Sequence, residues 1–130
     1  MLVSQDSCVA RYCAGVGSND RALLLANLRR GALEYCVLAY LRNGPSYGLD
    51  IARGLGAGAV LIESEGTLYP LLSRLRKGGL VTTELREASG GAARRYYELT
   101  DLGRSQLETF TDTWQEFTSS VNSILMGEPL

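Results

Sequence analysis

The segment that most constrains the fold is EGTLYPLLSRLRKGGLV, residues 65–81. Four of its leucines have the i, i+3, i+4, i+7 spacing of one helix face: Leu68, Leu71, Leu72 and Leu75. Thr67 can act as the N-cap, and Pro70 lies in the first turn, where its missing N–H does no harm. Gly78 and Gly79 are suited to a left-handed cap at the C-terminal end. The segment therefore predicts a short helix with its leucine face in a core.

The opposite face of this helix is polar and basic. Its members are Thr67, Tyr69, Ser73, Arg74 and Lys77. Residues 66–97 hold 6 basic and 2 acidic side chains, a net charge of +4, whereas the whole chain has a net charge of −1. An anionic partner is expected at such a patch. Taken alone, Arg74 and Lys77 are also consistent with an ordinary solvated helix face.

Two shorter helices are expected before this one. The helically spaced apolar residues of the first are Leu33, Val37 and Leu41. They predict a helix over about residues 30–42, with room for a turn before it, and Asn19 or Asp20 can cap the segment that leads into it. Ser46 follows turn residues and can cap a second short helix. The glycine-rich segment 54–60 follows no β-strand, so we interpret it as a connector and not as a phosphate-binding loop.

A β-hairpin is expected after the basic helix. Residues 80–87 and 94–100 alternate like half-buried strands, and the segment ASGGAA between them supplies turn residues. Tyr96 and Tyr97 are consistent with strand packing, and at least one of them should lie in the core. Three helices followed by a hairpin, with the third helix basic on its free face, describe a winged helix-turn-helix.

A long helix is expected at the C-terminal end, capped by Thr100. Six large apolar residues recur at intervals of 3, 4, 3, 4 and 3: Leu107, Phe110, Trp114, Phe117, Val121 and Ile124. This is a heptad pattern, and so small a domain has nothing left to cover it, so a second copy of the chain is the expected partner. The predicted fold class is α+β, mainly α: a winged helix-turn-helix with a long C-terminal dimerisation helix.

The 130 residues are enough for one domain with appendages. The expected organisation is a flexible leader at 1–20, a winged helix-turn-helix domain at 21–100, a dimerisation helix at 101–126 and a tail at 127–130. From Arg29 to Arg104 there are 11 basic and 8 acidic residues, whereas residues 105–130 hold no basic and 4 acidic residues. Positive charge is thus expected on the winged helix-turn-helix domain and negative charge on the last helix.

Composition argues against enzymes and metal sites. The chain has no histidine, and its three cysteines, Cys8, Cys13 and Cys36, lack the CxxC spacing of a zinc site. No nucleophile arrangement or cofactor motif can be assembled from the rest, and Cys36 is expected to be a small core residue. No apolar run approaches the roughly 18 residues of a membrane helix, and the start does not look like a secretion signal. A cytoplasmic protein without a cofactor is expected.

The basic helix and the hairpin together suit DNA. Duplex DNA carries about one negative charge per 1.7 Å of axis, which arginine and lysine can neutralise. Arg74, Arg76, Lys77, Arg94 and Arg95 are the expected phosphate contacts. Thr67, Tyr69 and Ser73 could reach base edges from a helix placed in the major groove. The alternative is a winged-helix module that binds another protein.

The ordered motifs GALEYCVLAYL, GPSYGLDIA, GTLYPLLSRLRKGGLV and GGAARRYYELTDLGR resemble the PadR family of transcriptional regulators, over roughly residues 28–126. Residues 1–27 depart from the family pattern. The resemblance implies a dimeric repressor that binds an inverted repeat near promoters and is released by a small molecule. The DNA-contacting positions it implies are Tyr47, Gly48, Thr67, Tyr69, Pro70, Arg74, Arg94 and Arg95.

Trp114 follows Gly103 by eleven residues. In multidrug-sensing regulators similar to this chain, a tryptophan at that spacing lines a pore between subunits and stacks on flat aromatic ligands. A planar aromatic effector bound at Trp114 is therefore one hypothesis. The other is that Trp114 only fills the heptad core.

Overall fold

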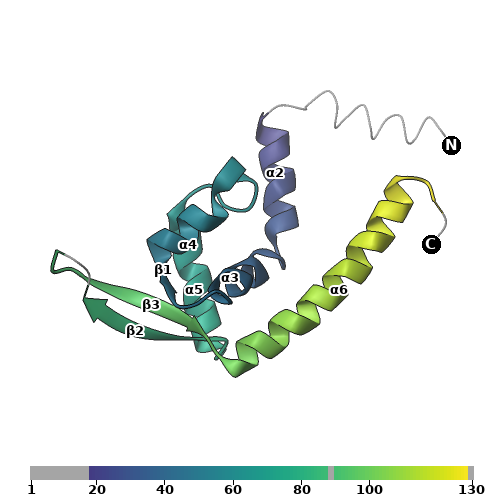
Figure 1. Cartoon of the computed structure of the whole chain (residues 1–130). Coiled ribbons are helices and arrows are strands. Elements are labelled where there is room, and N and C mark those ends of the chain that lie inside the picture. The colour runs from purple at the N-terminus through teal and green to yellow at the C-terminus, as the bar shows by residue number, and fades with distance from the viewer. Residues whose placement is uncertain (1–17, 88–89, 129–130) are drawn as a thin grey trace. The chain divides into compact units, whose positions relative to one another are not determined.

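The computed structural model describes residues 18–87 and 90–128 (Figure 1). The elements are α2 (Ser18–Arg29), α3 (Leu33–Leu41), β1 (Ser46–Tyr47), α4 (Gly48–Leu55), the 3-10 turns η1 (Ala57–Ala59) and η2 (Glu65–Thr67), α5 (Leu68–Lys77), β2 (Val81–Glu87), β3 (Ala93–Leu99) and α6 (Asp101–Leu125). The chain divides into two compact units, residues 1–33 and 34–130. Short helices, a small antiparallel sheet and a long final helix confirm the predicted winged helix-turn-helix class.

The first unit contains a helix that the sequence did not predict. Helix α2 occupies Ser18–Arg29, where the end of the leader, a cap at Asn19 or Asp20 and a turn before residue 30 were expected. Gly31 follows it with φ +80°, a conformation that favours glycine, and the next helix begins at Leu33 and not near residue 30. Helix α2 is only weakly amphipathic, which explains why periodicity overlooked it. The rest of the expected leader, residues 1–17 with Cys8 and Cys13, lies outside the described residues.

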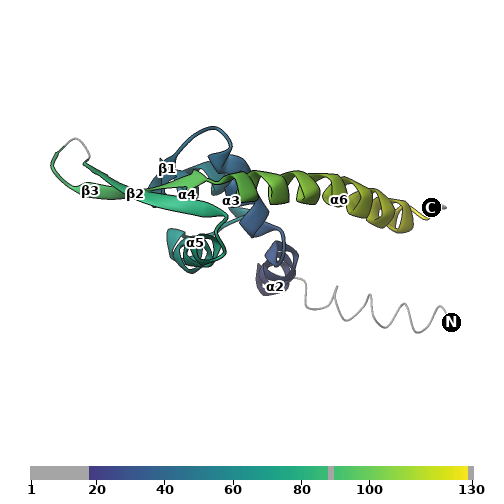
Figure 2. The same ribbon diagram turned by 90° about the horizontal axis from the view of Figure 1, so that it is seen from below.

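In the second unit, α5 supplies the largest share of the core. Its four predicted core leucines are all buried: Leu68, Leu71, Leu72 and Leu75. Apolar side chains of other elements are buried as well and complete the core: Val37, Leu38, Leu41, Ile51, Leu55, Ile62 and Val81. Burial of a leucine or isoleucine side chain stabilises a fold by about 1.5–3 kcal/mol. Figure 2 views α5 nearly end-on. Tyr69, Arg74 and Lys77 on its polar side are exposed.

The sheet has the strand order β1-β3-β2, with both pairs antiparallel. Tyr97 pairs with Ser46 on one side and with Thr83 on the other, and it is buried, as expected for one of the two tyrosines. Ser46 is a strand residue, so its predicted capping function is wrong; Tyr47 occupies the N-cap position of α4 without a side-chain cap. Backbone pairing of β1 with β3 takes Ser46 out of the position a cap requires.

Helix α5 begins and ends much as predicted, with one difference. Thr67 occupies the N-cap position but has helical backbone angles and no side-chain cap hydrogen bond. Its hydroxyl lies 3.3 Å from that of Ser64 instead. At the other end Gly79 has φ +78°, and the Leu80 N–H donates to the Leu75 carbonyl at 3.0 Å. The left-handed glycine cap is therefore confirmed.

Thr100 joins the hairpin, α5 and α6. Its hydroxyl accepts a hydrogen bond from the Gly103 N–H at 3.0 Å, which confirms the predicted cap, and donates to the Gly79 carbonyl at 2.7 Å. Gly103 lies so close to the Leu80 carbonyl oxygen that a Cβ there would overlap it. Helix α6 then continues for 25 residues, and only Gly103 and Leu107 within it are buried. Across the described ranges, no helix is both long and apolar enough to cross a membrane.

Candidate nucleic-acid interface

The polar face of α5 carries the predicted reading residues. Tyr69, Pro70, Arg74 and Lys77 are exposed, and Ser73 is half-buried. The Tyr69 ring is 45% exposed, and partial burial raises the pKa of its hydroxyl, with Glu65 raising it further. The phenol is therefore a neutral hydrogen-bond donor and acceptor at physiological pH. It can contact bases or phosphates without adding charge.

The hairpin presents its arginines on tyrosine rings. The Arg94 guanidinium lies over the Tyr47 ring, 4.4 Å from its centroid, and Arg86 lies over Tyr96 at 4.7 Å. Tyr47 and Tyr96 meet edge to face with centroids 5.4 Å apart. Stacking of this kind orients an arginine by its face and leaves the in-plane N–H groups to other partners; Nε of Arg86 lies 3.5 Å from Oε1 of Glu84. It also holds Arg86 and Arg94, which are direct cross-strand neighbours of like charge, in fixed places.

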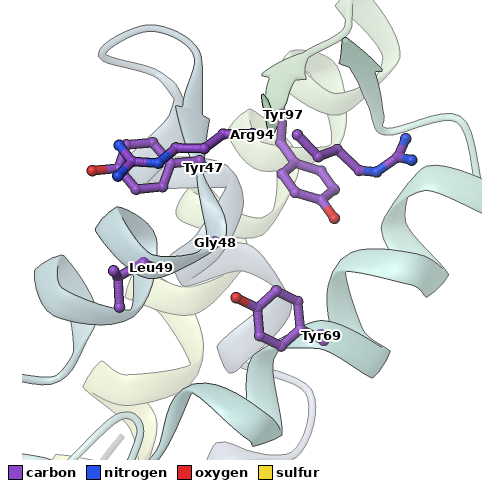
Figure 3. Close-up of a pocket in the computed structure, with 7 residues that line it drawn as sticks. Tyr47, Gly48, Leu49, Tyr69, Arg94 and Tyr97 are labelled. Atoms are coloured by element: carbon purple, nitrogen blue, oxygen red, sulfur yellow. The ribbon is translucent and has the colours of Figure 1, made fainter. Parts of the chain in front are cut away.

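One shallow hollow of about 250 Å³ lies between the start of α4, α5 and β3. Its lining consists of Tyr47, Gly48, Leu49, Tyr69, Arg94, Arg95 and Tyr97. Figure 3 shows Arg94 flat over Tyr47 and the Tyr69 ring below Gly48. Residues separated by up to 50 positions in the sequence are thus brought to one surface, with tyrosine hydroxyls and guanidinium groups around it. Such a surface suits a phosphate backbone.

Gly48 and Arg95 have specific contacts in this hollow. A Cβ on Gly48 would lie 2.7 Å from the Tyr69 ring, so the missing side chain makes room for that ring. Arg95 donates from Nη1 to the Thr83 hydroxyl on the adjacent strand at 3.1 Å. Both residues were singled out from the sequence, and both are placed beside Tyr69 and Arg94.

Hydrogen bonds to Asp50, a residue that the sequence did not single out, connect the segment before Tyr47 to α3 and α4. Asp50 accepts hydrogen bonds at one oxygen from the Ser46 hydroxyl, at 2.7 Å, and from the Tyr40 hydroxyl, at 3.0 Å. The Ser46 bond, then the Tyr40 bond, lowers the pKa of Asp50, so the carboxylate is charged at neutral pH. The i, i+4 spacing of Ser46 and Asp50 was a visible signal, but the contribution of Tyr40 required the fold.

Arg74 and Lys77 lie outside the hollow. Arg74 donates from Nε and Nη2 to the same Glu34 oxygen, both at 3.1 Å. Glu34 was not singled out from the sequence because the two residues are 40 positions apart. Pro70, Ser73 and Lys77 lie on the outward side of α5 between Tyr69 and Arg74, as helical geometry at about 100° per residue requires.

A row of aromatic rings runs along α6 on the predicted heptad stripe. Phe110 stacks on Tyr35 of α3 with centroids 4.1 Å apart and planes 4° from parallel. Trp114 follows at 5.6 Å from Phe110, and Phe117 at 6.4 Å from Trp114. Phe117 is 60% exposed and Trp114 44% exposed. Within residues 34–87 and 90–128, Leu107 is the one stripe member that is buried.

In the described part of the chain, no group of three or more His, Cys, Asp or Glu residues is placed to hold a metal ion. Cys36 is half-buried on α3, and burial raises the pKa of its thiol. A thiol in that state is a poor nucleophile, in keeping with the packing function expected for it.

Comparison with known proteins decides the family. Residues 37–109 match the model of the transcriptional regulator PadR-like family, a range that includes α4, α5 and the whole hairpin. The chain belongs to the PadR family. Transcriptional regulators form this family, and they bind DNA and are not enzymes.

Individual relatives agree with this assignment. The transcriptional regulator Rv3488 of Mycobacterium tuberculosis is 32% identical over 83 residues, which is 64% of this chain and 76% of that protein. A crystal structure of a PadR-like transcriptional regulator from Bacillus cereus has a TM-score of 0.70 and 36% identity, covering 78% of this chain and 99% of that one. A PadR family regulator from Eggerthella lenta has a TM-score of 0.71 and 32% identity, with 82% and 93% coverage. The similarity extends over nearly the whole of each of these two solved chains.

Proposed function

We propose that this regulator is a sequence-specific, homodimeric repressor that contacts its operator through α5 and the hairpin. The DNA contacts are assigned to Tyr47, Gly48, Thr67, Tyr69, Pro70, Ser73, Arg74, Lys77, Arg94 and Arg95. The observation that carries the proposal is the Arg94–Tyr47 stack beside Tyr69, which joins the hairpin to α5 in one surface.

Each part of this surface has its own expected task. Helix α5 enters the major groove, where Tyr69 and Ser73 face base edges. Arg94 and Arg95 contact phosphates next to that groove and fix the register of α5 on the duplex. Arginines already oriented by an aromatic ring or a threonine hydroxyl lose less freedom on binding, so their contacts are worth more.

The proposed dimer forms through the stripe on α6. Four of its large side chains are exposed at 37% or more: Trp114, Phe117, Val121 and Ile124. A second copy offers the same stripe across a two-fold axis, and a dimer with paired reading helices matches an inverted-repeat operator. Leu107 already belongs to the core of its own chain, so its share of the interface is expected to be small.

Release by a small aromatic molecule is the second part of the proposal. Phe110, Trp114 and Phe117 offer consecutive ring faces, and Trp114 is exposed enough to accept a planar ligand. Titration of a planar cationic dye against tryptophan fluorescence tests this point, since Trp114 is the one tryptophan of the chain. Quenching that saturates supports the effector site. Unchanged fluorescence at high micromolar dye leaves Trp114 as a core-filling residue.

The test of DNA binding begins with selection of bound duplexes from random genomic fragments. Fluorescence anisotropy then compares the wild type with Arg94→Ala plus Arg95→Ala on the selected duplex. Arg104→Ala, which removes one exposed arginine from α6, is the control for loss of positive charge outside the proposed DNA surface. The hairpin variant should bind at least tenfold more weakly, and the control should bind like the wild type. Recovery of no preferred duplex would favour the rival function, a winged-helix module that binds a protein.

A further inference from the structure

Glu34 of α3 forms an ion pair with Arg74 of α5, and the proposed function gives Glu34 no role. We propose that Glu34 is a specificity-determining residue that positions the Arg74 guanidinium for DNA. This rests on the proposed function, in which Arg74 contacts the operator. Glu34 itself touches no DNA in this proposal; it acts through Arg74.

The geometry of the pair fixes the plane of the guanidinium. Nε and Nη2 of Arg74 both donate to Oε1 of Glu34 at 3.1 Å, so one edge of the group is held. A guanidinium has five N–H donors. The two N–H groups of Nη1 and the second of Nη2 therefore remain for another acceptor. One N–H of Nη1 and the second of Nη2 point the same way and form the outer edge. The Arg74 side chain is 64% exposed and that of Glu34 is 36% exposed, so another molecule can reach the N–H groups that the pair leaves unused.

Glu34 is well placed to hold its partner still. It lies in the first turn of α3, where the helix dipole favours a carboxylate. The following turn of α3 carries Val37 and Leu38, both 0% exposed. Tyr35, the next residue, stacks on Phe110 with planes 4° from parallel. The carboxylate thus extends from a packed segment, whereas Arg74 alone would be a long, mobile side chain.

Two opposite effects of this pair on DNA binding are conceivable, and their magnitudes decide between them. If Glu34 masked Arg74, the pair would have to break before Arg74 could bind DNA, and the cost of breaking it would weaken DNA binding. The cost of breaking an exposed pair weakens binding by no more than about fivefold. A regulatory mask needs more than that. If Glu34 positions Arg74, the held edge reduces the freedom lost on binding and leaves the outer edge usable. The open geometry agrees with positioning.

The outer edge fits a planar pair of acceptor atoms. Two parallel N–H groups match O6 and N7 of guanine, and they match two oxygens of a phosphate equally well. Either contact sharpens recognition of the operator, the first by reading a base and the second by fixing the register of α5. Modified duplexes separate the two sources: 7-deazaguanine removes N7, and a methylphosphonate removes a charged phosphate oxygen.

The test measures discrimination between duplexes and not affinity alone. Dissociation constants for the selected operator and for a scrambled duplex are measured at matched salt for four proteins: wild type, Glu34→Gln, Arg74→Ala and the double variant. The ratio of interest is the dissociation constant for the scrambled duplex divided by that for the operator. We expect Arg74→Ala to lower this ratio by fivefold or more, the lower end of the range for a paired contact of this kind. Glu34→Gln should lower the ratio at least threefold while scrambled DNA binds as well or better. It should have no further effect when Arg74 is absent.

Glu63→Gln is the control for charge, since it removes one exposed carboxylate before α5. It should leave the ratio unchanged, and thermal melts should show that all variants fold. The effect of Glu34→Gln should vanish on the duplex, deazaguanine or methylphosphonate, that lacks the atom bound by Arg74. Its persistence on every such duplex would overturn the positioning proposal.

Three further outcomes separate the proposal from its basis. Glu34→Gln binding both duplexes more tightly, with an unchanged ratio, would show that Glu34 masks Arg74 and would overturn positioning. Arg74→Ala binding both duplexes as tightly as the wild type would remove Arg74 from the DNA contacts, and with it the proposed function at that residue. Equal weakening on both duplexes would leave Arg74 a non-specific phosphate contact and would overturn the specificity role of Glu34. The hairpin variants would then still report whether the rest of the DNA surface is used.

Discussion

Gly48 and Gly103 both have close neighbours where a Cβ would lie, but the neighbours differ in how easily they can move. A Cβ at Gly48 would meet the side-chain ring of Tyr69, which is 45% exposed and can rotate away. A Cβ at Gly103 would meet the backbone carbonyl of Leu80, which Thr100 and the end of α5 hold in place. The same substitution should therefore have a functional effect at one position and a structural effect at the other.

We predict that Gly103→Ala lowers the free energy of unfolding by about 2–3 kcal/mol, the upper range for overpacking. Gly48→Ala should cost less than about 1 kcal/mol, because an exposed ring can move. It should nevertheless weaken operator binding, since Tyr69 is displaced. Urea unfolding and anisotropy measure the two effects. Equal loss of stability in both variants would contradict the distinction drawn between backbone and side-chain neighbours.

Asp50 gives the stability a pH dependence of known sign. Its folded-state pKa is lowered by the Ser46 and Tyr40 hydrogen bonds from the ordinary aspartate value of 3.8. The stabilisation is therefore present in full above that value and is lost as the pH falls through the lowered pKa. Ser46→Ala should reduce the free energy of unfolding at pH 7. In strong acid the difference in free energy of unfolding between this variant and the wild type should become smaller. Urea unfolding between pH 7 and pH 2 measures this, and a gap that widens in acid would contradict it.

At the scale of elements, α6 is a long helix with little to cover it in its own chain. Phe117 and Ile124 are 60% and 64% exposed, so each can be replaced with small loss of monomer packing. We predict that Phe117→Ser plus Ile124→Ser converts a dimer into a folded monomer, as measured by light scattering and circular dichroism. Gln115→Ser, on another face of α6, should remain dimeric. A wild-type protein that is monomeric at micromolar concentration would refute the proposed interface.

Sequence patterns predicted the elements whose side chains repeat regularly. Leu68, Leu71, Leu72 and Leu75 predicted α5 and its buried face, and the alternation around the glycines predicted β2 and β3. Helix α2 was missed because it lacks a clear apolar stripe. The capping function of Ser46 was mistaken because β1 is two residues long, and so short a strand is specified by its partner β3 and not by its own sequence.

The sequence predicted which residues belong to the candidate site, but it did not predict which side chains contact one another there. Tyr47, Tyr69 and Arg94 were identified from motifs, and their placement in one hollow agrees with that choice. The Arg94–Tyr47 stack and the Arg74–Glu34 pair join residues about 40 or more positions apart, and only tertiary structure brings such residues together. Their functions in DNA binding remain predictions for the experiments described above.

For the whole molecule, the separation of charge matters more than its sum. The net charge of −1 would suggest a poor ligand for DNA, yet residues 66–97 carry +4 and the acidic residues after 104 lie on or beyond α6. Helix α6 is about 37 Å long at about 1.5 Å per residue. Acidic groups along it are expected to lie more than one Debye length, about 8 Å at physiological salt, from a duplex bound at α5.

The salt dependence of operator binding tests this separation. Binding should weaken linearly on a plot of log affinity against log salt, with a slope of about −0.9 for each phosphate contact. Arg94→Ala removes one contact per protomer, so in a dimer it should make the slope shallower by about 2. Exchange of Glu108, Asp112 and Glu116 for their amides changes the net charge by +3 but should leave the slope unchanged. If these three amides alter the slope as much as Arg94→Ala does, total charge and not its placement governs binding, and the DNA surface assigned to α5 and the hairpin would have to be redrawn.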